Sequence, residues 1–133
     1  MTQEEKDLLL KDLCTRLSCE VKVDHFGTVK DLLGIMPSSE NVMVGYDIND
    51  YEDSVIEDIK PYLRPMSSMT EEEKVQLSQY ACIGEDLNGE FVDEVQRKDC
   101  AAYIDWLNKN HFDYRDLILK GLALEAPEGM YKI

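Results

Sequence analysis

The chain has 133 residues, 44% of them hydrophobic, and its 28 acidic residues against 14 basic ones give a formal net charge of −14. This length and apolar content predict a single globular domain over residues 1–133 and exclude a largely disordered chain. The negative charge repels phosphate backbones and anionic lipids, and therefore argues against direct nucleic-acid or membrane binding.

Residues 2–17 predict an amphipathic helix. Thr2 and Glu5 have the spacing of a capping box, in which each side chain satisfies a backbone N–H of the other residue. The stretch is acidic where a signal peptide would be basic. The chain also contains no run of about 18 apolar residues, the length that a membrane span needs. We therefore expect a cytoplasmic protein. The predicted core-facing stripe comprises Leu9, Leu10, Leu13, Cys14 and Leu17.

The next segment, 19–59, predicts a small antiparallel sheet. Alternating apolar and polar residues favour a first strand within 19–27 that ends in a turn. Residues 28–36 fit either a strand or a helical turn, and the turn residues that follow favour the strand. A third strand is expected over 41–46 and a short fourth one over 54–59. Short strands with tight connections predict a meander, which can curl into an SH3-like barrel.

Two prolines shape the interpretation of residues 60–65. Proline lacks a backbone N–H and fixes its own backbone, so Pro61 and Pro65 argue against a regular helix or a central strand. We expect an extended surface connector with Tyr62 and Leu63 turned inward.

Thr70 and Glu73 form a second capping box and predict a helix that ends at Gly84. The residues expected to face inward are Val75, Leu77, Tyr80, Ala81 and Ile83. The following residues, 84–98, are polar, with a turn expected at Asn88-Gly89.

The stretch 99–127 has the densest apolar content and the only tryptophan, Trp106. Helical periodicity predicts a helix over 99–110 capped by Asp99, with Ala101, Ile104 and Leu107 inward. A second short helix is expected over 114–120, with Asp113 as its cap and Gly121 at its end. We expect these helices to meet at a corner with Trp106, Phe112 and Tyr114 packed nearby, and the sequence leaves the order of the tail 128–133 open.

The cysteines and histidines give no metal or catalytic motif. Cys14, Cys19, Cys82 and Cys100 include no CxxC pair, so reduced thiols are expected, with Cys14 and Cys100 buried. His25 and His111 could in principle join a Cys–His or His–Asp pair, but a surface or corner position is the simpler interpretation. No catalytic residue, metal ligand or cofactor is predicted.

The run 46–58 is the best candidate site, because six acids occur in it without a base. Its side chains could line a solvated loop, form a partner-facing patch or bind calcium. Asp47 and Asn49 fit the first two ligand positions of an EF-hand loop, but Glu52 stands where that loop needs glycine. The candidate partner-binding residues are Asp47, Asp50, Glu52, Asp53, Glu57 and Asp58.

Two segments, IKPYLRPMSSMTEEE (59–73) and WLNKNHFDYRDLILKGLALEAPEGMY (106–131), resemble stretches in small uncharacterised proteins of gut anaerobes and of their phages and mobile elements. The resemblance implies a bacterial or phage cytoplasmic protein. It carries no activity and no site residue.

Together these features predict an α+β domain that acts as a non-enzymatic accessory protein of a phage or mobile element, through contact between its acidic surface and another protein. One alternative is a nucleic-acid mimic that inhibits a host nuclease or defence complex by offering carboxylates in place of phosphates. Another is a small enzyme of unknown reaction, which would need a deep pocket that brings His25 or His111 to a cysteine.

Overall fold

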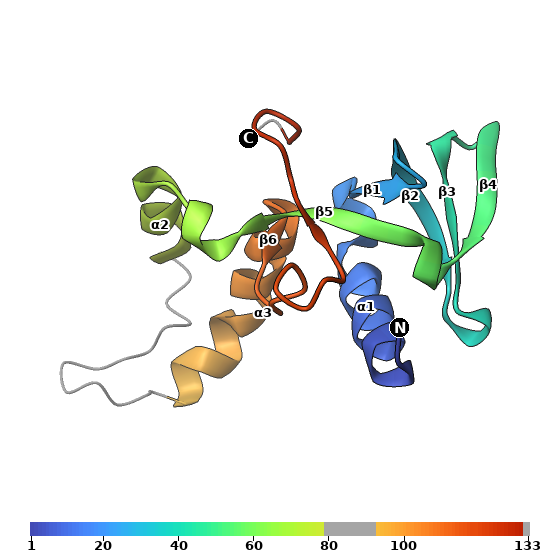
Figure 1. Ribbon diagram of the computed structural model, residues 1–133. Coiled ribbons are helices and arrows are strands. Elements are labelled where there is room, and N and C mark those ends of the chain that lie inside the picture. The colour runs from blue at the N-terminus through green and yellow to red at the C-terminus, as the bar shows by residue number, and fades with distance from the viewer. Residues whose placement is uncertain (79–92, 132–133) are drawn as a thin grey trace.

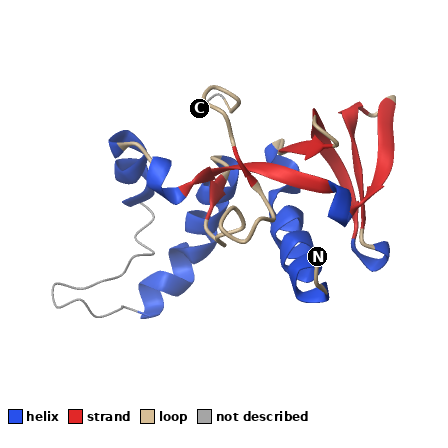
Figure 2. Ribbon diagram, viewed as in Figure 1, coloured by secondary structure: helices blue, strands red, loops and turns tan. Residues whose placement is uncertain are grey.

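The computed structural model describes residues 1–78 and 93–131 and shows a mixed α+β architecture, as the sequence predicts (Figures 1 and 2). Helix α1 (Gln3–Arg16) lies against a twisted sheet. Helices α2 (Glu71–Ser78) and α3 (Asp93–Lys109) lie toward the opposite end of the molecule from β4. The strands are β1 (Lys22–His25), β2 (Thr28–Met36), β3 (Asn41–Asp47), β4 (Asp50–Val55), β5 (Ile59–Pro65), β6 (Phe112–Asp113) and β7 (Leu124–Glu125). None of the helices in the described ranges is long and apolar enough to cross a membrane.

The first four strands form an antiparallel meander, and β5 returns to pair with β1. The order along the sheet is β4-β3-β2-β1-β5-β6, and β7 also pairs with β5. β6 and β7 are both parallel to β5, whereas the pairs among β1 to β5 are antiparallel. The antiparallel sheet is therefore confirmed, but the SH3-like barrel is not, because the sheet is not closed.

Helix α1 begins as its sequence predicts. The Thr2 hydroxyl accepts a hydrogen bond from the Glu5 N–H at 3.1 Å, and the Glu5 carboxylate accepts one from the Thr2 N–H at 2.9 Å. Leu9 and Leu13 are fully buried against the sheet. The expected burial of Cys14 is wrong, since its side chain is exposed. The buried face of the helix instead carries Asp12 and Arg16, which form an ion pair.

The fourth strand lies earlier than expected. β4 covers Asp50–Val55 inside the acidic run, and a 3-10 turn (Ile56–Asp58) buries Ile56 in the core. β4 is an edge strand with almost every side chain exposed. An edge strand that is wet on both faces has no apolar alternation to reveal it, which is why the sequence suggested a loop.

The connector predicted over 60–65 is wrong, because these residues belong to β5. The β1 ladder reaches only from Ile59 to Pro61, and the β6 ladder engages only Arg64 and Pro65. Each proline therefore lies at the end of a short ladder, where a missing N–H is tolerated. The inward position of Leu63 is confirmed, since this side chain is fully buried.

Two predicted helix boundaries near the C-terminus are also wrong. α3 starts at Asp93, so Asp99 lies inside it rather than at its cap. Residues 114–120 form bends and a turn rather than a helix, because the left-handed backbone of Asp116 (φ 58°) interrupts any helical path. The Asp113 carboxylate still accepts hydrogen bonds from two backbone amides, those of Leu117 at 2.9 Å and Ile118 at 3.0 Å. The left-handed backbone expected at Gly121 is confirmed (φ 76°).

The described side chains form two apolar clusters. The larger one joins α1, the sheet and residues 117–123. The smaller one contains Trp106, Leu107, Phe112 and Leu77, and Tyr114 packs against it. The Trp106 and Phe112 rings stack with centroids 5.7 Å apart, which confirms the predicted aromatic packing.

Some side chains predicted to face the core are exposed, and others belong to residues that the structure does not describe. Ala101 and Val75 are exposed, while Leu77 is buried as expected. The predictions outside the described residues are those for Tyr80, Ala81, Ile83, Gly84 and Asn88-Gly89. The side chains of Cys82 and Cys100 are likewise not described.

The second capping box is confirmed and connects α2 to β5. Glu73 accepts hydrogen bonds from the Thr70 N–H at 3.0 Å and from both terminal nitrogens of Arg64 at 2.7 Å. The hydrogen bond from Arg64 holds the pKa of Glu73 below its usual value. This carboxylate therefore fixes both the start of α2 and its attachment to the sheet.

Candidate functional site

The acidic run, residues 46–58, folds as a hairpin rather than a loop, and we call it the acidic hairpin. β3 and β4 pair from Asn41 and Val55 down to Asp47 and Asp50, at the edge of the sheet. Because the run is strand and 3-10 turn, the calcium-loop interpretation is wrong. Among the described residues, no group of three acidic, histidine or cysteine side chains could hold a metal ion.

Two of the six candidate acids are neutralised by lysines. Glu52 binds Lys30 and lies 3.3 Å from the Nδ1 of His25, and Glu57 binds Lys6 at 2.8 Å. The hydrogen bonds from Lys30 and Lys6 lower the pKa values of Glu52 and Glu57, respectively. These two carboxylates therefore hold the hairpin and the 3-10 turn against the rest of the fold.

The other four acids carry uncompensated charge. One carboxylate oxygen of Asp47 accepts a hydrogen bond from the Asn49 N–H at 2.7 Å, which closes the turn without neutralising the acid. Asp50, Asp53 and Asp58 are exposed and have no cationic partner within the part of the chain that the structure describes. The structure thus leaves Asp47, Asp50, Asp53 and Asp58 available to an outside partner.

Large apolar side chains are exposed on the same hairpin, and the sequence analysis missed them. Tyr46, Ile48, Tyr51 and Val55 are between 48% and 80% exposed. Phe26, in the β1–β2 turn, is also exposed, and this turn lies at the same end of the sheet as the β3–β4 turn (Figure 1). Exposed aromatic residues beside charged ones are typical of protein-binding surfaces. Their signal was present in the sequence as apolar residues between the acids.

Gly45 allows β3 and β4 to approach closely at the base of the hairpin turn. A Cβ atom at this position would lie 2.2 Å from the Asp50 carbonyl oxygen and 2.5 Å from the Tyr51 Cα. Both of these are backbone atoms, so they cannot move aside without shifting β4.

We expect Gly45→Ala to destabilise the protein by about 1–3 kcal/mol, the usual cost of overpacking, and to increase amide hydrogen exchange along β4. Gly34→Ala on the neighbouring strand is the matched control. Its Cβ would meet chiefly the flexible Met43 side chain, with the sulfur at 3.1 Å. Urea unfolding and amide exchange measure both effects. Equal behaviour of the two variants would contradict the close approach at Gly45.

A cavity of about 540 Å³ lies where the C-terminal tail crosses the sheet. His111 in its wall is buried, and its ring stacks on that of Tyr131 with centroids 3.6 Å apart. The Tyr131 hydroxyl accepts a hydrogen bond from the Lys22 N–H at 3.0 Å and donates one to the Tyr62 carbonyl at 2.7 Å. The tail, whose order the sequence left open, is therefore held against the sheet as far as Tyr131. The lining residues are Leu17, Glu20, Lys22, Asp31, Leu32, Leu33, His111, Met130 and Tyr131.

In the part of the chain that the structure describes, neither the cavity at His111 nor the one at Cys19 brings a histidine and a cysteine together. No cysteine lines the cavity at His111, and no histidine lines the shallow one at Cys19. The surface position expected for His25 is wrong, because its ring is buried beside Lys30 and Glu52. These positions give the enzyme hypothesis no catalytic pair.

Burial lowers the pKa of His111 to about 4, and the charges of Arg16 and Arg64 add to this effect. In the unfolded chain the pKa is near 6.5, so below that pH the unfolded state binds a proton that the folded state does not. The contribution of His111 to stability is thus complete above pH 6.5 and falls between pH 6.5 and 4.

We expect the free energy of unfolding to fall by about 2 kcal/mol between pH 7.5 and 5 because of His111 alone. His111→Asn should flatten this part of the profile, since asparagine tolerates the left-handed backbone at this position (φ 64°). Urea midpoints at several pH values provide the measurement, and the slope is compared rather than the absolute stability. An unchanged slope in the variant would assign the loss to other groups.

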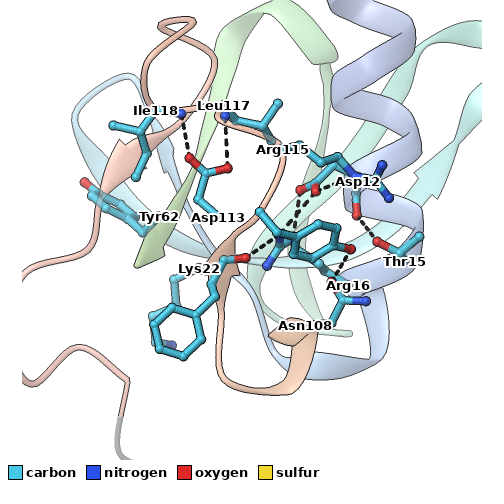
Figure 3. A network of polar contacts seen from close by, with 12 residues as sticks. Asp12, Thr15, Arg16, Lys22, Tyr62, Asn108, Asp113, Arg115, Leu117 and Ile118 are labelled. Carbon is cyan, nitrogen blue, oxygen red and sulfur yellow. Dashed lines mark hydrogen bonds and ion pairs between the residues drawn. The ribbon is translucent and has the colours of Figure 1, made fainter. Parts of the chain in front are cut away.

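A buried polar network fixes α1 to the C-terminal segment (Figure 3). Asp12 accepts hydrogen bonds from the Arg16 Nε at 2.8 Å and from the Arg115 Nε at 3.0 Å. Arg16 also donates to the Phe112 carbonyl at 2.6 Å, and the Tyr114 hydroxyl lies 2.7 Å from the Asn108 side-chain oxygen. Because the side chains of Asp12 and Arg16 are fully buried, this network is structural rather than a binding site.

The acidic hairpin is therefore the described surface that best combines free charge with exposed aromatic residues. Comparison of the chain with protein-family models, with curated proteins and with solved structures finds no match.

Proposed function

We propose that the protein is a non-enzymatic accessory protein that acts through protein–protein contact and uses the acidic hairpin to bind a basic surface of its partner. The observation that carries this proposal is the exposure of Tyr46, Ile48 and Tyr51 among the unpaired carboxylates of one hairpin. The resemblance of two segments to proteins of phages and mobile elements supports placing the accessory role there.

The two kinds of side chain would contribute differently. Carboxylates on an exposed edge attract a basic partner over a distance set by salt, and so raise the rate of association. Tyrosine rings provide large contact areas with few rotatable bonds, and therefore contribute more to the lifetime of a complex. For a binding surface of this kind, added salt should slow association, and removal of the tyrosine rings should speed dissociation.

The test compares proteins captured from bacterial lysate by the wild-type chain with those captured by two charge-matched variants. Asp50→Asn/Asp53→Asn removes two charges from the hairpin, and Glu4→Gln/Asp7→Asn removes two from the exposed side of α1. We expect the same basic protein to bind the wild type and the α1 variant, and to be lost with the hairpin variant or at high salt. Equal capture by both variants would contradict the proposal, as would turnover of a small molecule without any protein partner.

The nucleic-acid mimic is the alternative that this experiment also addresses. Mimicry needs carboxylates aligned on one face, yet α2, with Glu71 and Glu72, lies at the opposite end of the molecule from β4 (Figure 1). If a captured protein is displaced by duplex DNA at matched ionic strength, the hairpin competes for a phosphate-binding groove. If it is not displaced, the contact is an ordinary protein interface.

A further inference from the structure

The open edge of β4 can accept another strand. β4 is the terminal strand in the sheet order. It pairs with β3 on one side, and no strand of the described residues pairs with it on the other. An edge strand presents unpaired backbone N–H and C=O groups that pair readily with an extended segment of another chain.

The register identifies which backbone groups are free. The Ile56 N–H donates to the Glu40 carbonyl at 3.0 Å, so the adjacent pair Asn41 and Val55 lies between ladder hydrogen bonds. In an antiparallel ladder bonded and non-bonded pairs alternate, which places the bonded pairs at Ser54 and Glu52. The N–H and C=O groups of Tyr51 and Asp53 therefore point away from β3.

The side chains along β4 indicate what kind of strand would fit. Glu52 pairs with the buried Val44 and so lies on the inner face of the sheet, whereas Tyr51 and Asp53 lie on the outer face. Acids thus occur on both faces of the edge. A second copy of this chain would set like charges opposite each other if its own β4 paired here, and this is unfavourable.

We propose, building on the hairpin as the docking surface, that the partner contributes an extended basic segment that adds to β4 as a further strand. Backbone hydrogen bonds to Tyr51 and Asp53 hold the segment in place. Its lysine or arginine side chains lie on the outer face, beside Asp53 and Tyr51, and its apolar side chains lie on the inner face. The charge pattern selects a basic segment, and the free backbone groups require it to be extended.

Titration with synthetic peptides tests the mode of binding. The probe is a short capped peptide in which lysine alternates with valine, added to the full chain labelled for amide NMR. We expect the amide signals of Tyr51 and Asp53 to shift most, and N-methylation of the peptide along one edge to abolish binding while methylation along the other edge preserves it. Binding that survives methylation of either edge, or the absence of shifts at these two amides, would overturn strand addition.

A pair of protein variants provides an independent test. Asp53→Ala and Asp53→Pro both remove the carboxylate, but only proline removes the N–H that points to the open edge. That N–H takes no part in the β3–β4 ladder, so proline is compatible with the strand. We expect peptide binding by Asp53→Pro to be weaker than by Asp53→Ala by up to about tenfold, the worth of one hydrogen bond.

The outcomes separate the two proposals. If Asp53→Pro and Asp53→Ala bind the peptide equally, but both more weakly than wild type and in a salt-dependent way, the acidic hairpin is a charged docking surface without strand addition. If neither differs from the wild type, the docking surface itself is wrong. A glutamate–valine peptide that binds as well as the lysine–valine one would also overturn the basic partner.

Discussion

Asp12→Ala is expected to lower the free energy of unfolding by about 3–5 kcal/mol, a large part of the stability of a domain of this size. The substitution leaves the Arg16 guanidinium fully buried without its carboxylate. One nitrogen of that guanidinium, Nη1, already has no hydrogen-bond partner, so the local structure has no spare acceptor for the lost bonds. Urea denaturation followed by circular dichroism measures the effect.

Two further variants define the cause of this loss. Asp7→Ala changes an exposed acid on the same helix and should cost less than about 1 kcal/mol. The double variant Asp12→Leu/Arg16→Met removes both buried charges and should recover much of the stability, since an apolar pair of similar volume avoids the desolvation cost. A double variant no more stable than Asp12→Ala would mean that the hydrogen bond from Arg16 to the Phe112 carbonyl, rather than the uncompensated charge, controls the effect.

Phe112→Ala is expected to destabilise the protein by about 3–5 kcal/mol, the range for truncating a buried phenylalanine. Its ring is fully buried, stacks on Trp106, and lies 4.2 Å below the Arg64 guanidinium. The variant would therefore open a cavity and remove both an aromatic and a cation–π contact.

The chain has a single tryptophan, so fluorescence reports directly on this cluster. We expect a red shift of Trp106 emission in folded Phe112→Ala, together with a lower urea midpoint. Phe26→Ala is the matched control, because that ring is 74% exposed and its loss should change neither quantity. Unchanged Trp106 emission in Phe112→Ala would show that the stack does not shield the indole.

Local signals in the sequence predicted local structure well. Both capping boxes are present, and the second strand has the expected ends at Thr28 and Met36. These features depend on residues within a few positions of each other, so a single sequence contains the information. The predicted packing of Trp106 near Phe112 is also local, because only a few residues separate them.

Long-range pairing explains the principal errors. Pro61 and Pro65 argue against a strand only until the partners of β5 are known, and those partners lie as far away as Phe112 and Leu124. The burial of Arg16 likewise depends on the Phe112 carbonyl. For the candidate site, the sequence located the acids correctly but could not show which of them lysines neutralise, nor that they form a sheet edge.

The placement of β5 has a consequence for how the protein folds during synthesis. One partner of β5, the strand β1, precedes it in the chain. Its parallel partners, β6 and β7, follow much later. While the ribosome is still producing the C-terminal third, one side of β5 has nothing to pair with, and non-local parallel pairing is slow to form. The nascent chain is therefore most exposed to misassociation and to chaperone capture at residues 59–65, at a stage when the meander before them can already have formed.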